Sequence, residues 1–110
     1  MSKAPKRERV LDLIGLAARA GSAVAGTERV RQEARAGGLR FAVIATDASE
    51  NAQKKLIPLL QARRLPYSVA FRRHELGLAL GRGGLSAVAI TRDSFAMRLA
   101  ELLDASSDLE

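Results

Sequence analysis

The sequence predicts an α/β fold in which a small sheet is sandwiched between helices. Short apolar runs alternate along the chain with longer segments whose apolar residues recur at helical spacing, a pattern typical of buried strands between helical layers. The chain has 110 residues, enough for one domain with its own core. We expect that domain to span residues 8–104, between a disordered basic arm at 1–7 and a disordered acidic tail at 105–110.

The first third of the chain predicts two helices and a brief strand. Apolar residues at helical spacing predict a helix from about Glu8, and Gly21 stands where it should end. Residues 23–25 can form a short strand. The Gly-Thr pair that follows makes Thr27 the expected N-cap of a second helix, which the glycines at 37–38 should stop.

The middle third contains the strand expected at the centre of the sheet. Residues 41–45 are a continuous apolar run, as in a strand buried on both faces. Asp47 and Glu50 have the spacing of a capping box, which predicts the start of a leucine-rich helix. Pro58 lies inside that helix and should break or kink it, because proline lacks the N–H donor of a helical turn.

The last third predicts two further strands and two helices. Residues 67–71 and 86–91 have strand character, and 75–80 form a short helix between them that glycine closes. The last helix should be capped by Asp93 or Thr91 and bury its leucines and alanines. Helices and strands thus alternate to the end of the domain.

The distribution of charge indicates a polyanionic partner. The net charge is +6, but the last ten residues carry four acids and no base, so residues 1–100 have a net charge of +10. Of the 18 basic residues 14 are arginine, whose planar fork binds phosphate through two hydrogen bonds. Nucleic acid is the first expectation and an anionic membrane surface the second; the alternative is a surface kept soluble by charge.

Composition argues against several other classes of protein. The absence of cysteine excludes disulfides, cysteine zinc sites and thiol nucleophiles. The only histidine, His74, has no second histidine or carboxylate at a spacing typical of metal sites or catalysis. We therefore expect no enzyme activity and no cofactor. Because no apolar run is long enough to cross a membrane and no secretory signal is evident, we expect a cytoplasmic protein.

Two segments have the chemistry of a nucleic-acid site. At the start of the second helix, free backbone N–H groups could bind phosphate, while Glu28 could accept hydrogen bonds from base amino groups and Arg29, Arg31 and Gln32 could donate them. The glycine-rich loop at 82–84 carries an arginine and could contact a backbone. The alternatives are a solvated helix and a plain connector. With four aromatic residues, stacking on single strands is disfavoured, which favours structured RNA.

Several segments together resemble the kink-turn-binding ribosomal protein superfamily, of the archaeal and eukaryotic large-subunit type. They are Gly26-Thr27 opening a helix, Gly37, FAVIATDAS, LPYSVAFRRHELGLALG and SAVAITRDSFAMRLAELL. The match runs from about Val10 to Leu103 and is closest to the small bacterial YlxQ-like branch. The resemblance implies a three-layer α/β/α sandwich around a mixed four-stranded sheet.

The resemblance also implies a function, the binding of RNA kink-turns. In RNA-binding members the second helix begins with Asn-Glu or Lys-Gln and has Lys three residues later; here Glu28, Arg29 and Gln32 hold those places. The residues expected to contact RNA are Gly26, Thr27, Glu28, Arg29, Arg31, Gln32, Arg35, Ser49, Glu50, Asn51, Lys54, Lys55, Arg82, Gly83, Gly84 and Leu85.

The expected partner is a structured RNA, ribosomal or messenger, in the setting of the ribosome, translation or transcription termination. Ribosomes and transcription or translation factors are further expected partners, membranes are not, and the chain should be a monomer. The changed helix start leaves an alternative open, a protein–protein interaction module of the same fold that has lost kink-turn specificity. The chain could also be a domain of a longer protein.

Overall fold

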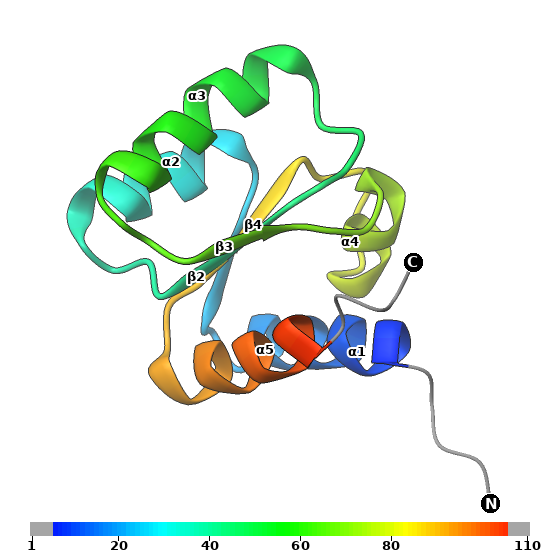
Figure 1. Cartoon of the computed structure of the whole chain (residues 1–110). Coiled ribbons are helices and arrows are strands. Elements are labelled where there is room, and N and C mark those ends of the chain that lie inside the picture. The colour runs from blue at the N-terminus through cyan, green and yellow to red at the C-terminus, as the bar shows by residue number, and fades with distance from the viewer. Residues whose placement is uncertain (1–5, 106–110) are drawn as a thin grey trace, which may run out of the picture.

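The computed structural model describes residues 6–105, and the elements follow one another in the predicted order (Figure 1). This part of the chain forms five helices and four strands. They are α1 (Lys6–Arg19), β1 (Ala23–Ala25), α2 (Thr27–Ala36), β2 (Phe41–Ile44), α3 (Glu50–Ala62), β3 (Tyr67–Val69), α4 (Arg73–Ala79), β4 (Ala87–Ile90) and α5 (Asp93–Ala105).

The four strands form one mixed sheet in the order β1-β4-β2-β3. β2 is parallel to β3 and antiparallel to β4, and β1 is antiparallel to β4. All residues of β2 and β4 are buried, as expected for central strands covered by helices on both faces. The prediction that residues 41–45 lie at the centre of the sheet is confirmed.

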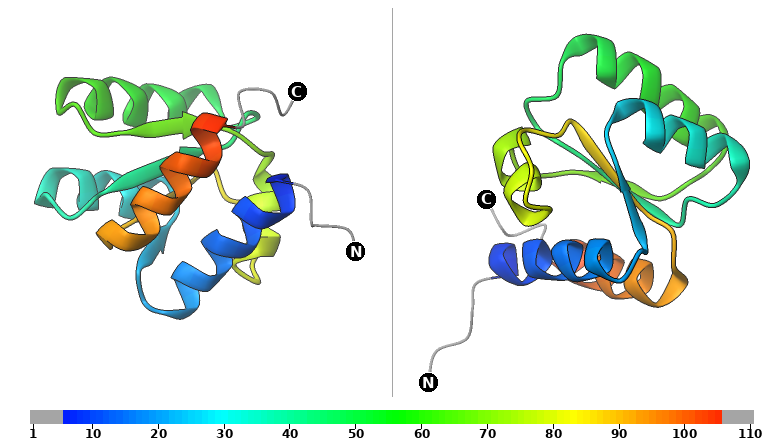
Figure 2. Two further views of the ribbon diagram at one scale, coloured as in Figure 1. Left: turned by 60° about the horizontal axis from the view of Figure 1, so that its bottom comes forward. Right: turned by 180° about the vertical axis from the view of Figure 1, so that it is seen from behind.

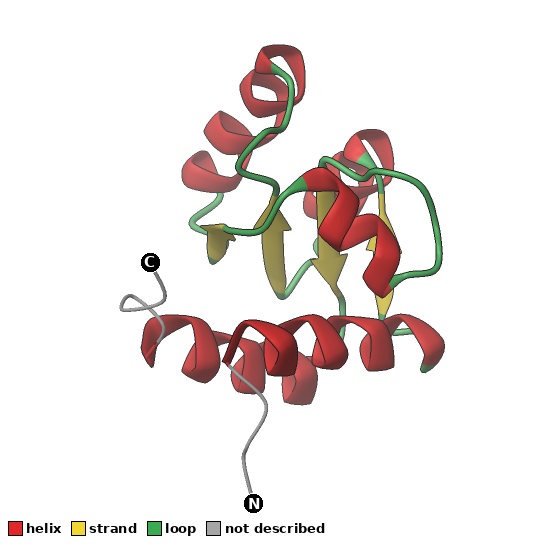
Figure 3. Ribbon diagram, turned by 90° about the vertical axis from the view of Figure 1, so that its right-hand side faces the viewer, coloured by secondary structure: helices red, strands yellow, loops and turns green. Residues whose placement is uncertain are grey.

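Helices cover both faces of the sheet, so the α/β/α sandwich is confirmed. In Figure 1, α2 and α3 lie above the strands and α1 and α5 below them, and Figure 3 shows the same layers from the side. α1 and α5 run side by side (Figure 2), and α4 packs beside α1 at one end of the sheet. Within residues 6–105 no helix is both long and apolar enough to cross a lipid bilayer.

Both helical layers contribute to one hydrophobic core. Ile14 of α1 and Leu99 of α5 are fully buried on one face of the sheet, and Leu56 of α3 is fully buried on the other. Ile44 of β2 and Ile90 of β4 fill the layer between them. Packing of these apolar side chains fixes how the helices lie, and it therefore fixes which side chains the connecting turns expose.

Three of the predicted helix caps are wrong. α5 begins at Asp93, so its N-cap position belongs to Arg92 and not to Asp93 or Thr91. Thr27 is the first residue of α2, and the N-cap position belongs to Gly26, so no side chain caps this helix. Asp47 and Glu50 form no capping box. Ser49 caps α3, its hydroxyl accepting a hydrogen bond from the Ala52 N–H at 3.1 Å. The β2–α3 turn is two residues longer than the capping-box prediction assumed, which frees Asp47 for another contact.

The predicted break at Pro58 does not occur, because α3 runs continuously from Glu50 to Ala62. Pro58 lies on the exposed face of the helix, while Leu56 and Leu60 are buried on the other face. The carbonyl that loses its partner is that of Lys54, four residues earlier, and Lys54 is exposed as well. Water can bind that carbonyl, so the helix continues through the proline.

Several boundaries differ from the prediction by one or two residues. α1 begins at Lys6, so Lys6 and Arg7 belong to the helix and not to an arm. Ala105 is the last residue of α5. The remaining residues of the expected arm and tail, 1–5 and 106–110, lie outside the described residues. β3 ends at Val69, two residues early, because the chain turns sharply at Phe71.

Candidate nucleic-acid interface

Four connections of the chain meet at one end of the sheet, which we call the site end. It comprises the turns β1–α2, β2–α3 and β3–α4 and the loop α4–β4. The backbone hydrogen bonds that join them run from Gly26 N–H to Ala87 O (2.9 Å), Ala45 N–H to Ser86 O (2.8 Å), Thr46 N–H to Phe71 O (2.7 Å) and Leu85 N–H to Arg73 O (3.1 Å). Segments far apart in sequence therefore present their side chains together.

The β1–α2 turn depends on glycine. Gly26 has φ 99° and ψ 151°, a conformation that only glycine adopts readily. A Cβ built at Gly26 would meet no atom within 4 Å, so this backbone faces open space. Because Val30 and Ala34 are buried against the sheet, the first turn of α2 points Glu28 and Arg29 outward. The exposed backbone is thus accessible to a large ligand.

The side chains at the start of α2 differ in their availability. The Glu28 carboxylate lies 3.1 Å from the Lys55 ammonium and 3.6 Å from the Arg31 guanidinium. The hydrogen bond from Lys55 is the main cause that lowers the pKa of Glu28. Within the described residues, the side chains of Arg29 and Gln32 make no hydrogen bond or ion pair. Arg29 and Gln32 are therefore the groups on this turn that are freest to contact a ligand.

The β2–α3 turn and the start of α3 offer weaker contacts. The Ser49 hydroxyl already accepts the capping hydrogen bond, and Glu50 pairs with Lys54 at 3.7 Å on the exposed surface. Asn51 is exposed next to them. Exposed pairs of this kind contribute about 0–1 kcal/mol, so Lys54 can leave Glu50 for a phosphate at small cost.

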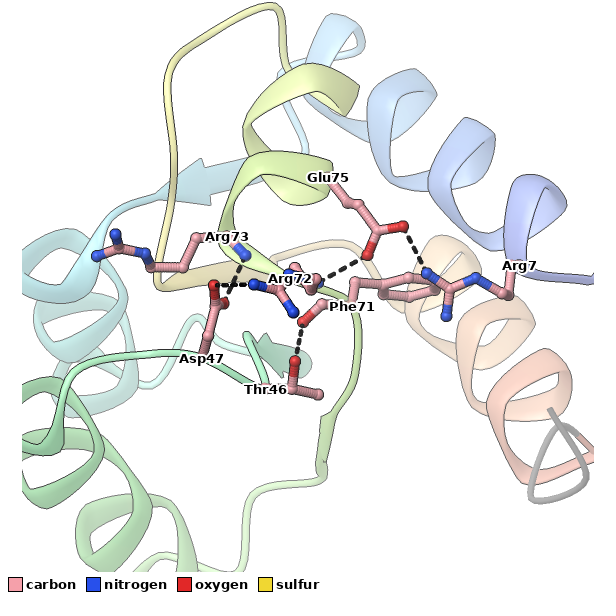
Figure 4. A network of polar contacts seen from close by, with 7 residues as sticks. All are labelled: Arg7, Thr46, Asp47, Phe71, Arg72, Arg73 and Glu75. Atoms are coloured by element: carbon pink, nitrogen blue, oxygen red, sulfur yellow. Dashed lines mark hydrogen bonds and ion pairs between the residues drawn. The ribbon is translucent and has the colours of Figure 1, made fainter. Parts of the chain in front are cut away.

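Asp47 joins the β2–α3 turn to the β3–α4 turn (Figure 4). Its carboxylate accepts a hydrogen bond from the Arg73 N–H at 2.7 Å and lies 3.8 Å from the Arg72 guanidinium. The Arg73 N–H is the main cause that lowers the pKa of Asp47. The Arg73 guanidinium points away from this network. The carboxylate therefore fixes the backbone of the turn and leaves one arginine side chain free.

Glu75 and Arg7 hold the same turn from the other side. Glu75 accepts hydrogen bonds from the Arg72 N–H at 2.8 Å and from the Arg7 guanidinium at 2.5 Å. The backbone donor contributes most to lowering the pKa of Glu75. Arg7 also lies 4.9 Å from the centre of the Phe71 ring, a cation–π distance. These contacts stabilise Phe71 at φ 67°, a strained backbone for a side chain of this size.

The α4–β4 loop is only partly as predicted. Arg82, Gly83 and Gly84 are exposed, and the Arg82 N–H donates to the Gly77 carbonyl at 2.7 Å. Leu85 is buried, with 7% of its surface exposed, so its side chain packs in the core and not on the surface of the loop, and its contact with RNA stays a prediction. Leu85 belongs to the core because the chain has already turned inward there to begin β4.

Arg35 is not part of the site end. It lies in the last turn of α2, and eight residues of helix separate it from Thr27 by about 12 Å. Conversely, the sequence prediction missed Arg72 and Arg73. The parallel pairing of β2 with β3 would have found them, because it puts the ends of both strands at the same edge of the sheet, but that pairing is not visible in either strand alone.

The Asp47 and Glu75 carboxylates, which hold the β3–α4 turn, predict that this turn is sensitive to acid. Both have a lower pKa in the folded chain than their ordinary values of 3.8 and 4.5, so their stabilisation is complete above about pH 4.5 and is lost as pH falls through the lower, folded pKa. We expect Asp47→Asn with Glu75→Gln to flatten the fall of the unfolding free energy below pH 4.5, measured by chemical denaturation. Glu8→Gln, a control on exposed α1, should keep the fall; an unchanged slope in the double variant would contradict the prediction.

Comparisons with known proteins are consistent with this geometry. The model of the ribosomal protein L7Ae/L30e/S12e/Gadd45 family matches residues 8–100. The RNA-binding protein YlxQ of Bacillus subtilis (strain 168) is 35% identical over 92 residues, which cover 84% of this chain and 92% of that protein. The RNA-binding protein YlxQ of Enterococcus faecium is 30% identical over 98 residues, or 89% of this chain and 94% of that protein.

Solved structures share the fold. A protein of unknown function from Bacillus halodurans C has a TM-score of 0.82 and 30% identity, covering 86% of this chain and 96% of that one. The 15.5kD RNA binding protein of Giardia lamblia has a TM-score of 0.77 at 18% identity, covering 100% of this chain and 94% of that one. The second likeness concerns the fold alone.

Proposed function

We propose that this chain, which belongs to the ribosomal protein L7Ae/L30e/S12e/Gadd45 family, binds structured RNA through its site end. The observation that carries the proposal is the meeting of four connections there, with a surplus of exposed arginines around a glycine turn. Two relatives that match most of the chain are named RNA-binding proteins, which supports the same partner.

The start of α2 supplies the chemistry for one RNA segment. The N–H groups of its first turn have no partner within the helix and carry its positive dipole, so they can donate to a phosphate that approaches Gly26. Arg29 and Gln32 can then reach base edges, while Glu28 accepts from a base amino group without leaving Lys55. These contacts use both the shape and the bases of the RNA.

The second part of the site end suits a bent RNA. Arg73 is the first residue of α4, and the α4–β4 loop that carries Arg82 lies beside it, because the Leu85 N–H donates to the Arg73 carbonyl. They can bind a backbone that turns back from α2, as the backbone of a kink-turn does. We therefore infer that the partner is a kink-turn or a similar bend in ribosomal or messenger RNA, in the setting of translation or transcription termination.

Titration against a kink-turn RNA and a straight duplex of equal length tests this function. We expect the bent RNA to bind at least tenfold more tightly, about 1.4 kcal/mol, and to keep that preference at two salt concentrations. Equal affinities with a steep salt dependence would leave only phosphate attraction and would refute recognition of the bend.

A second candidate function is the binding of a protein. It is favoured by Leu78, which is 73% exposed beside a cavity of about 570 Å³ between α1 and α4. Gly15 lines this cavity, and a Cβ added to Gly15 would approach the Ala79 carbonyl to 2.7 Å. Weak binding to both RNAs, together with a partner whose affinity does not change with salt and falls in Leu78→Asp, would favour this function.

A further inference from the structure

A second group of arginines lies at the opposite end of the sheet, which we call the far end. Arg35 and Arg63 come from the ends of α2 and α3, Arg64 follows α3, Arg40 precedes β2 and Arg92 follows β4. Backbone hydrogen bonds hold these segments together. The Arg40 N–H donates to the Ile90 carbonyl at 2.7 Å, and the Ala42 N–H donates to the Pro66 carbonyl at 3.1 Å. They occupy the left side of Figure 1.

Four of the five far-end arginines have no carboxylate partner within the described part of the chain. Arg40 pairs with Asp93 at 3.1 Å. Within the described residues, the Arg63 side chain donates one hydrogen bond, to the Arg35 carbonyl at 3.5 Å. Arg35, Arg64 and Arg92 have no carboxylate partner there. All five side chains are exposed. A concentration of positive charge therefore faces solvent at this end.

Helix dipoles explain only part of this arrangement. A cation near the C-terminus of a helix is favourable, which accounts for Arg35 and Arg63. Arg92, however, immediately precedes the N-terminus of α5, where a cation is unfavourable. Arg64 has φ 56°, a left-handed conformation that costs an ordinary residue about 1–2 kcal/mol and that glycine adopts freely. The positions of Arg64 and Arg92 thus oppose local stability.

We propose that the far end is a second phosphate-binding surface, which holds the backbone of another RNA segment while the site end binds the first. This inference rests on the proposed function only in taking RNA as the partner. The surface has the character of a nucleic-acid interface, since all its cations are arginines, whose forks match phosphate oxygens. It lacks the apolar centre of a protein interface: the exposed large apolar side chains in the described part, Leu16, Val69, Leu78 and Met97, lie outside these turns.

A capture experiment tests the second surface. A kink-turn RNA is immobilised and saturated with the full chain, and a labelled RNA duplex is then added. We expect the loaded wild type to capture the duplex. The variant R63Q/R64Q should capture it about tenfold more weakly, and the slope of its log affinity for the duplex against log salt should be smaller by about 1.5. The affinity of this variant for the kink-turn should be unchanged. The control R19Q/R98Q removes the same charge from α1 and α5 and should retain capture.

The outcomes separate this inference from the proposed function. No capture by loaded wild type, or equal capture by R63Q/R64Q, overturns the second surface even when the kink-turn binds. If the kink-turn does not bind, the proposed function fails. The second surface is then tested by titrating the duplex directly, and it is supported if the salt dependence of duplex binding is smaller in R63Q/R64Q than in the wild type. Polyglutamate that binds the far end more tightly than the duplex would overturn RNA as the partner. Thermal melting confirms that each variant folds.

Discussion

Replacing Gly77 with alanine is expected to lower the free energy of unfolding by about 2 kcal/mol, the balance of an overpacking cost of about 3 kcal/mol and the preference of helices for alanine. Gly77 lies in α4 beneath the α4–β4 loop, and an added Cβ would overlap the Gly83 carbonyl and come within 2.9 Å of the Arg82 carbonyl. Both are backbone groups that no change of rotamer can move. The preference of helices for alanine, about 1 kcal/mol, offsets only part of this cost.

The consequence of Gly77→Ala reaches the site end. The Gly77 carbonyl accepts a hydrogen bond from the Arg82 N–H at 2.7 Å, which holds the α4–β4 loop against α4. The clash of the added Cβ with Gly83 would push this loop away and weaken that hydrogen bond. Thermal denaturation should show a melting temperature lower by about 10 °C, and the kink-turn should bind more weakly. Gly83→Ala is the matched control, because its Cβ would meet no atom within 4 Å. Equal melting temperatures for the two variants would contradict this account.

The loop also shows where sequence patterns suffice and where they do not. The apolar runs predict β2 and β4 because burial on both faces requires apolar residues at successive positions. The same pattern does not predict whether Leu85 is buried, because Leu85 precedes β4 and follows the glycines of the loop. Its burial depends on where α4 packs, since Arg73 accepts the Leu85 N–H from twelve residues away. That contact belongs to the tertiary structure.

The helix caps and the site end also depend partly on local sequence and partly on tertiary contacts. The sequence predicts the start of α2 as a contact because a Gly-Thr turn before a helix is a local signal. It assigns Asp47 to a local capping box, whereas the carboxylate binds the Arg73 N–H, 26 residues away. The order of strands brings these turns together, and the pairing of β2 with β3 is not visible in either strand alone. Arg72 and Arg73 were missed for this reason.

Charge reversal at the start of α2 is expected to have the largest effect on binding. Arg29→Glu should weaken kink-turn binding by at least a hundredfold, about 3 kcal/mol, because it removes a donor and brings a carboxylate against RNA phosphates. Its stability should stay within about 0.5 kcal/mol of the parent. Arg29 is exposed and, within the described residues, its side chain has no ion pair or hydrogen bond to lose.

A matched reversal elsewhere separates specific contact from the change in net charge. Arg98→Glu alters the total charge by the same amount on α5, where its present partner is the exposed Glu101 at 3.4 Å, and it should weaken kink-turn binding only a fewfold. Long-range attraction is screened beyond about 10 Å at 0.1 M salt, so the two variants should differ more as salt rises. Equal losses in both variants at high salt would show that α2 is not the contact, since only a direct contact survives that screening.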